Sequence, residues 1–442
     1  MKLFLALIIL LLLNNCSFDN KSGIWKNTND GFNDTEDQIF KDFKRISSEI
    51  EIFNKIIDID NKFKFSIEDP QNNKSWKDVF YSLSNNTKNF KYTNINQLIF
   101  KSKKTTKYKP KDRILFENNN LILSDVKGNI IIFSIRDNKI IAQFNFYKKQ
   151  FKRVKKFINF TVENNIIYIS DNIGYIYAYN YITDQVIWAK KHQVPFRSNL
   201  KLSSNRIITS NQNNDLFIFD KLNGNLLKLI PSEETIINNF FENNIALNDT
   251  NIYFLNTFGS LYSINQNNYR FNWFVNLNNS VDLSLSNLFS GSQIVLYEDK
   301  ILLSSNDNFY IIENSSGSII SKKNFSSSFK PIINNKYIFL ITKNNFLIVM
   351  QLKDGKIIYS YKISDKVAEY LGTKKEKLDI KNFMIVNSNI YAFLKNSRLI
   401  QFDIKGSVKD IKKLPSSLNT HPIFIDNYLI YLNKNNKIII VN

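Results

Sequence analysis

The chain of 442 residues holds few side chains that could do chemistry. Cys16 is its single cysteine, and His192 and His421 are its two histidines. One cysteine excludes an intramolecular disulfide, a zinc site built from cysteines and an iron–sulfur cluster. Two histidines leave little for metal or acid–base chemistry, and no histidine–carboxylate pair stands out as a general base. We therefore expect no catalytic residue, no metal site and no cofactor.

The surroundings of Cys16 indicate a covalent role for its thiol. Lys2 is followed by the apolar run Leu3–Leu13, which is typical of a signal peptide and shorter than the ~20 residues of a spanning helix. The segment that ends at Cys16 resembles the lipobox of bacterial lipoproteins, whose cysteine is lipidated and becomes the first mature residue. Asn15 stands where that pattern has Gly, Ala or Ser.

We therefore predict that residues 1–15 are a lipoprotein signal peptide and that Cys16 carries the lipid. Ser17 resembles the residue that directs a lipoprotein to the outer membrane. Two or more acyl chains hold a protein to a membrane far better than one. The alternative is a plain secretory signal with a chance cysteine.

The rest of the chain is organised by repeats. Past residue 110, runs rich in Ile, Phe and Tyr alternate with Asn, Asp, Gly and Ser, which indicates strands and turns. One pattern recurs about every 40–50 residues, which is the period of a propeller blade. It consists of a turn residue, apolar residues two, three and five positions later, and a polar residue at the sixth position. The eight turn positions are Gly128, Gly174, Asn214, Gly259, Asp307, Asn345, Ser397 and Asn436.

These repeats predict an all-β fold, an eight-bladed β-propeller of four-stranded antiparallel blades over residues 97–442. The last repeat stops after its third strand, and the apolar run 97–101 belongs to no blade. We expect this run to close blade eight, which would pair an edge that otherwise invites aggregation. Seven blades are the alternative.

Residues 16–96 form a tether and an N-terminal extension before the propeller. The acidic stretch 17–38 lacks the glycine and terminal glutamate of a calcium loop, so we expect a flexible tether there. Apolar residues recur every three or four positions over 40–57, which predicts an amphipathic helix. That helix would pack on the propeller or bind a partner.

The formal net charge of +20 raises the possibility of a nucleic-acid partner. The lysine clusters, however, lie in no recognition helix or RNP-like motif, and an exported lipoprotein would rarely meet nucleic acid. We expect no nucleic-acid binding. The lysines either lie in solvated loops or attract anionic partners and lipid headgroups.

The best-formed repeat, Gly174–Asn180 with Trp188 after it, resembles the repeat of the BamB family, and Trp273 takes the same place two repeats later. BamB proteins are lipoproteins with a pyrroloquinoline-quinone-like propeller. The resemblance implies a non-enzymatic scaffold of the outer-membrane β-barrel assembly machine, lipid-anchored on the periplasmic face of the outer membrane. It would bind the POTRA domains of the barrel-inserting subunit BamA and assist insertion of outer-membrane proteins, and its blade edges could also hold unfolded precursors.

The resemblance also implies a partner-binding segment. In the family, a Leu-Arg pair before the first strand of a blade contacts BamA. Phe196 and Arg197 take these places here, with Ser198 next, between blade two and blade three. An exposed aromatic anchor beside an arginine is typical of an interface hot spot. The alternative is that Phe196 fastens the loop to its blade and that Arg197 is solvated.

Two rival functions belong to other classes. Quinone-dependent dehydrogenases share this propeller, and that resemblance implies a cofactor held by tryptophan and a vicinal disulfide, with calcium on carboxylates. One cysteine excludes that disulfide, and four tryptophans are too few for the tryptophan girdle of such enzymes. A periplasmic propeller lipoprotein that binds another protein or a glycan is the second rival, because fold alone does not decide function.

Overall fold

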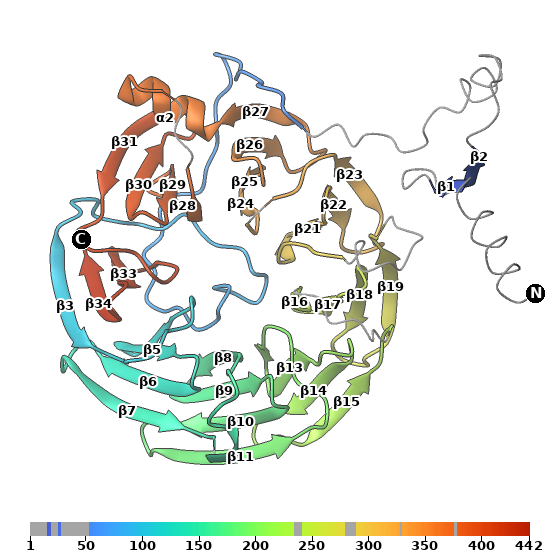
Figure 1. Ribbon diagram of the computed structural model, residues 1–442, viewed down its shortest axis with the longest axis vertical. Helices are drawn as coiled ribbons and strands as arrows, with labels where there is room; N and C mark the ends of the chain where they lie inside the picture. Colours follow the sequence, from blue (N-terminus) through green and yellow to red (C-terminus); the bar gives the residue numbers. More distant parts are fainter. Residues whose placement is uncertain are drawn as a thin grey trace, which may run out of the picture. The chain divides into compact units, whose positions relative to one another are not determined.

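The computed structural model describes residues 16–18, 25–27, 53–147, 149–233, 241–278, 289–327, 329–374 and 378–442. The chain forms two units, Met1–Glu51 and Ile52–Asn442. In the first unit, β1 (Cys16–Phe18) pairs antiparallel with β2 (Trp25–Asn27). The second unit is a ring of eight four-stranded sheets (Figure 1). The prediction of an all-β, eight-bladed propeller is confirmed.

Each blade is an antiparallel meander whose first strand lies nearest the centre of the ring (Figure 1). Blades one to four consist of β4 (Leu115–Glu117), β5 (Asn120–Ser124), β6 (Asn129–Ser134) and β7 (Lys139–Asn145); β8 (Ile158–Glu163), β9 (Ile166–Asp171), β10 (Tyr175–Asn180) and β11 (Gln185–Lys191); β12 (Lys201–Ser203), β13 (Arg206–Ser210), β14 (Leu216–Asp220) and β15 (Leu226–Ile230); and β16 (Asn244–Leu247), β17 (Asn251–Leu255), β18 (Ser260–Asn265) and β19 (Phe271–Asn276).

Blades five to eight continue the same order around the ring. Their strands are β20 (Val295–Tyr297), β21 (Lys300–Ser304), β22 (Phe309–Glu313) and β23 (Ile319–Lys323); β24 (Ile332–Asn334), β25 (Tyr337–Ile341), β26 (Phe346–Gln351) and β27 (Ile357–Lys362); β28 (Ile380–Val386), β29 (Asn389–Leu394), β30 (Arg398–Phe402) and β31 (Val408–Lys413); and β32 (Ile423–Ile425), β33 (Tyr428–Leu432), β34 (Lys437–Val441) and β3 (Leu98–Lys104). The helix α2 (Ile363–Leu371) and the 3₁₀ turn η3 (Lys149–Phe151) lie in connections between blades.

The turn between the second and third strands explains the recurring turn residues. All eight except Asp307 have a positive φ. Gly is favoured there because it lacks the Cβ that crowds the following carbonyl oxygen, and Asn because its short side chain can hydrogen-bond locally. Three residues before the turn position, a side-chain Oδ1 accepts the backbone N–H groups two and four residues further on. Five such acceptors are Asp125, Asp171, Asn211, Asn256 and Asn433.

Tryptophans of the outer strands link neighbouring blades. Trp188 of blade two donates its Nε1–H to the Lys221 carbonyl of blade three, and its ring covers Gly224. Trp273 of blade four donates to the Asn314 carbonyl of blade five in the same way, at 3.0 Å, and its ring covers Gly317. A glycine is required at each contact because a Cβ would overlap the indole.

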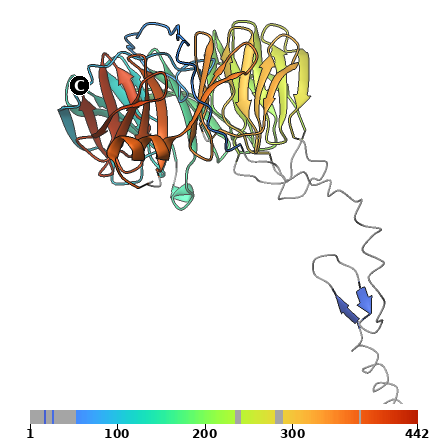
Figure 2. The same cartoon turned by 90° about the horizontal axis from the view of Figure 1, so that it is seen from above.

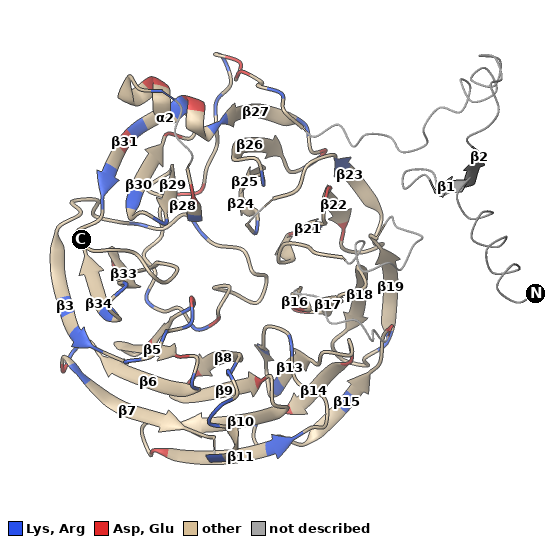
Figure 3. Ribbon diagram, in the orientation of Figure 1, with Lys and Arg blue, Asp and Glu red and all other residues tan. Residues whose placement is uncertain are grey.

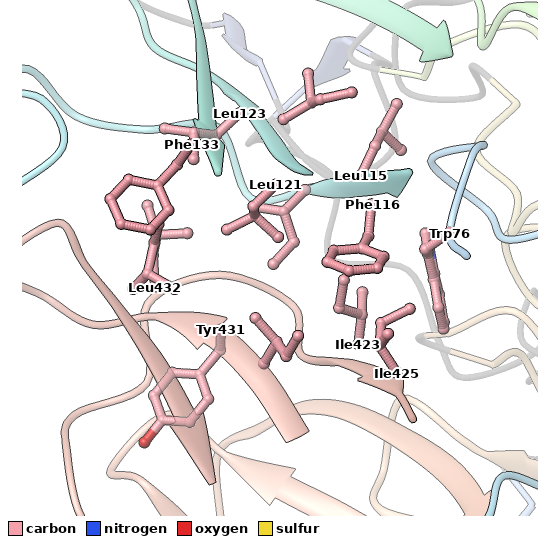
Figure 4. Close-up of a cluster of buried hydrophobic side chains, with 14 of the residues drawn as sticks. Trp76, Leu115, Phe116, Leu121, Leu123, Phe133, Ile423, Ile425, Tyr431 and Leu432 are labelled. Carbon is pink, nitrogen blue, oxygen red and sulfur yellow. The ribbon is translucent and has the colours of Figure 1, made fainter. Parts of the chain in front are cut away.

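The strand β3 closes the ring. It pairs antiparallel with β34, so blade eight combines strands from both ends of the propeller. Blade eight then packs against blade one, and Figure 4 shows side chains of β4, β5 and β6 facing those of β32 and β33, with Trp76 beside them. The expectation from sequence placed the closing strand at 97–101, and β3 spans Leu98–Lys104.

The segment before β3 is extended. The signal peptide 1–15 and residues 40–52 of the expected helix 40–57 lie outside the described residues. The last five positions of that helix, 53–57, are not helical. Ile57 instead exchanges both backbone hydrogen bonds with Ser360 at the outer strand of blade six, and Phe53 packs its ring edge-on to Phe325 and Phe346.

Residues 73–90, called here the axial segment, run through the centre of the ring (Figure 1). The segment hydrogen-bonds to the inner strand of every blade, or to the turn after it. In chain order its attachments are Asn73 to Phe424 and Asp426, Trp76 to Phe116, Lys77 to Val162, Ser82 to Lys201, Leu83 to Leu247, Ser84 to Leu296, Asn86 to Ile333 and Phe90 to Ile385. The axial segment therefore passes once around the axis, from blade eight through blades one to seven.

Candidate functional site

The predicted partner-binding residues lie in the connection from β11 to β12, residues 192–200, called here the blade 2–3 loop. The backbone N–H of Phe196 donates to the Asp171 carbonyl, and that of Arg197 donates to the Ser210 carbonyl at 2.8 Å. The carbonyl of Arg197 accepts from Asn243 of the next blade connection at 3.0 Å. These bonds tie the loop to blades two, three and four.

Phe196 is buried, with 3% of its surface exposed. Its ring centroid lies 5.7 Å from that of Phe217 and 6.2 Å from that of Phe219, and His192 covers the same cluster. The expectation of an exposed aromatic anchor is wrong. Burial of such a ring stabilises the fold by about 1.5–3 kcal/mol, so Phe196 fastens the loop to blade three. Burial also lowers the pKa of His192, which favours the neutral imidazole beside these rings.

Ser198 and Arg197 differ in exposure. Ser198 is fully buried, and its Oγ accepts the Ser210 backbone N–H at 2.7 Å and donates to the Asn199 carbonyl. Arg197 is half-buried. Of the three predicted contact residues, Arg197 alone is partly exposed, while its two neighbours are buried and hold the loop.

The blade 2–3 loop lies on the face of the ring opposite the axial segment. The backbone of the axial segment bonds to Leu247 and Ile385 at or near the ends of their inner strands, whereas this loop precedes β12, whose first residue Lys201 reaches the segment through its side chain. Because a four-stranded meander returns to the face where it began, every connection to the next blade lies on that same face, called here the loop face. Figure 2 shows α2 and η3 on this side and a loop of the blue N-terminal segment of the propeller on the other.

Cys16 lies in β1, and its lipidation stays a prediction. None of the helices in the described part of the chain has the length and apolar composition needed to cross a membrane.

An ion pair that sequence reasoning missed holds the axial segment. Lys201 begins β12 with a fully buried side chain, and its Nζ donates to Asp78 Oδ2 at 2.8 Å, to the Ser82 carbonyl and to Asn85 Oδ1. Burial lowers the pKa of Lys201, while the Asp78 carboxylate opposes that shift. The sequence does carry a signal for this ion pair: Lys201 is charged, whereas the first residue of every other inner strand is apolar or uncharged.

Across the described ranges, no cluster of three histidine, cysteine, aspartate or glutamate residues could hold a metal ion. The one cysteine of the chain, Cys16, belongs to the other unit. Basic residues occur on inner as well as outer strands around the ring (Figure 3).

Comparison with solved structures shows the same fold. BamB from Moraxella catarrhalis superposes with a TM-score of 0.60 at 10% identity, over 78% of this chain and 99% of that chain. The computationally designed protein Ika8 gives 0.60 at 11%, over 78% and 99%. Quinohemoprotein alcohol dehydrogenase from Comamonas testosteroni gives 0.61 at 9%, over 83% and 80%. Such identities establish fold alone.

No curated protein matches the chain at the level of sequence. A family model does: it is described as outer membrane protein assembly factor BamB and matches residues 126–361. The match covers more than half of the chain, from the second turn of blade one through the outer strand of blade six. The repeats, the eight-bladed ring and this match lead to one conclusion, that the chain belongs to the BamB family.

Proposed function

We propose that the protein is a non-enzymatic scaffold of the outer-membrane β-barrel assembly machine. In this proposal, a lipid on Cys16 anchors it to the periplasmic face of the outer membrane. Its loop face binds the POTRA domains of a BamA-like subunit and so assists insertion of outer-membrane proteins. The family match over residues 126–361 carries the proposal, because it includes the blade 2–3 loop.

Arg197 is the proposed contact residue within that loop. Its backbone is fixed by hydrogen bonds on both sides, so little loop ordering opposes binding. A guanidinium presents N–H donors in a planar fork that matches a carboxylate. We therefore infer that Arg197 binds an acidic side chain of the partner and that Phe196 and Ser198 position the loop. The net charge of +20 would speed association with an acidic surface and make its rate fall with salt.

The test is co-purification from detergent-solubilised envelopes, read by mass spectrometry. The wild type is compared with Arg197→Glu and with the matched control Arg136→Glu, whose exposed arginine lies in the β6–β7 turn on the opposite face. We expect the barrel-inserting subunit with wild type and control and not with Arg197→Glu. Recovery with all three would remove Arg197 from the interface. If the wild type and both variants recover a different protein instead, the chain is a propeller lipoprotein that binds another partner.

A second candidate activity, binding of unfolded barrel precursors, has its own observation. The outer strand β15 is the edge of its sheet in the described part of the chain, and its residues Leu226, Leu227 and Leu229 are between 42% and 47% exposed. Extended chains bind such edges by strand addition. Urea-unfolded outer-membrane proteins should bind the purified propeller saturably and less tightly after Leu227→Lys. Absence of saturable binding by the wild type would refute this activity.

A further inference from the structure

A cavity of ≈ 230 Å³ lies in the channel between the axial segment and the loop face. Its basic wall comes from four blades, at positions that precede or begin their inner strands, and its floor comes from the axial segment. The basic side chains are Arg113 of blade one, Lys330 of blade six, Lys381 of blade seven and His421 of blade eight. Trp76, Phe80 and Thr87 line it from the axial segment.

The donors of this wall are poorly satisfied by the protein. The Arg113 guanidinium lies over the Phe80 ring, 5.3 Å from its centroid, and makes no hydrogen bond to the residues that the structure describes. Lys330 Nζ donates to the Asn85 carbonyl, which leaves two of its three N–H groups. Lys381 Nζ lies 4.0 Å from Asp112 Oδ1, whose side chain is 60% exposed.

Two further polar atoms in the cavity wall are buried and have no hydrogen-bond partner among the described residues. They are Thr87 Oγ1, on a residue only 2% exposed, and His421 Nδ1. Buried polar side-chain atoms in native structures are hydrogen-bonded in the large majority of cases. Two orphans in one cavity, beside unsatisfied cations, point to a ligand that accepts hydrogen bonds.

The charge of the site is unbalanced. Arg113, Lys201, Lys330 and Lys381 surround the axis, against the two carboxylates Asp78 and Asp112. Asp78 is already bonded to Lys201. Burial, with Arg113 and Lys201 nearby, lowers the pKa of Lys330 well below its ordinary value. An anion in the cavity would offset the cost of holding these cations in the interior.

We propose that this axial cavity binds a small multivalent oxyanion, of the phosphate or carboxylate class, through Arg113, Lys330 and Lys381. Thr87 and His421 supply neutral hydrogen bonds to it. The cavity faces away from the outer strands, so the site is separate from the blade edges. It does not depend on the scaffold function, and its test uses the isolated protein.

The experiment is titration calorimetry of the propeller at low ionic strength with sodium phosphate, sodium citrate and sodium chloride. Saturable heat with phosphate or citrate, and none with chloride, is expected, and the stronger of the two names the oxyanion. Arg113→Gln and Lys381→Gln should each weaken binding about tenfold, since a charge-assisted hydrogen bond is lost. The control Arg136→Gln removes the same charge from an exposed turn and should leave the dissociation constant unchanged.

Circular dichroism and thermal melting show whether each variant folds. Lys381 has a side chain 15% exposed at the edge of the site, so Lys381→Gln provides the reading if Arg113→Gln does not fold. No saturable heat in the folded wild type overturns the proposal. Equal affinity in wild type and Lys381→Gln also overturns it, because the anion then binds elsewhere.

Discussion

Gly317 provides a direct test of how neighbouring blades are held together. Its φ is +76°, and a Cβ there would lie 2.6 Å from Cε3 of Trp273, whose ring covers it. Gly372, after α2, has a similar φ of +64° but nothing within 4 Å of such a Cβ. Alanine in the left-handed region costs about 1–2 kcal/mol at either position. Overpacking adds about 1–3 kcal/mol at Gly317 alone.

We therefore expect Gly372→Ala to lower the free energy of unfolding by about 1–2 kcal/mol and Gly317→Ala by about 2–5 kcal/mol. Urea unfolding of the protein without residues 1–15, followed by circular dichroism, measures both. Trp273→Ala combined with Gly317→Ala should cost about 1–3 kcal/mol less than the sum of the single changes, because the clash disappears. Equal costs for the two glycines, or strictly additive effects, would refute the proposed indole contact.

Four further outcomes follow from the same structure. Asp78→Ala leaves Lys201 buried without its carboxylate and should cost about 3–5 kcal/mol, seen in urea unfolding and in faster hydrogen exchange of residues 73–90; unchanged exchange there would contradict it. Burial and nearby cations lower the pKa of His421 well below 6.5, so below about pH 6.5 the unfolded state binds a proton that the folded state does not. The free energy of unfolding should therefore fall as the pH drops below about 6.5, by up to ~1.4 kcal/mol per pH unit. His421→Gln should flatten this pH dependence between pH 5 and 7. Cys16→Ser should move the protein from the membrane pellet to the soluble fraction after cell lysis, and retention in the pellet would count against a lipid anchor. Phe196→Ala should cost about 3–5 kcal/mol, measured by urea unfolding, and a cost below 1 kcal/mol would show that the ring is not part of the core.

The blades could be predicted because each one repeats a local pattern. The turn positions stand out in the sequence since a left-handed φ selects Gly or Asn, as at Gly128 and Asn436. The apolar columns after them are the third strands, buried on both faces between neighbouring blades. Both signals act over a few residues, so they survive in a single sequence.

The axial segment could not be predicted for the opposite reason. Residues 73–90 have no period, and their partners lie far away in the chain: Asn85 bonds to the carbonyls of Ile245 and Ile294, 160 and 209 positions on. The exposure of Phe196 was likewise undecidable, because the same ring could cover Phe217 or face a partner. Only the placement of β14 under the loop settles it.

The axial segment passes once around the axis, and this bears on how the number of blades is determined. Propeller blades are similar enough that rings of seven or nine are conceivable competitors, and specificity against such alternatives needs a feature that distinguishes them. The segment offers successive attachments to blades eight, one, two and onward to seven, each matched to one inner strand. A ring with one blade fewer would leave one set of hydrogen-bonding groups of the axial segment without a partner, and one blade more would interrupt the series. We therefore expect these eighteen residues to favour a ring of eight blades over rings of seven or nine.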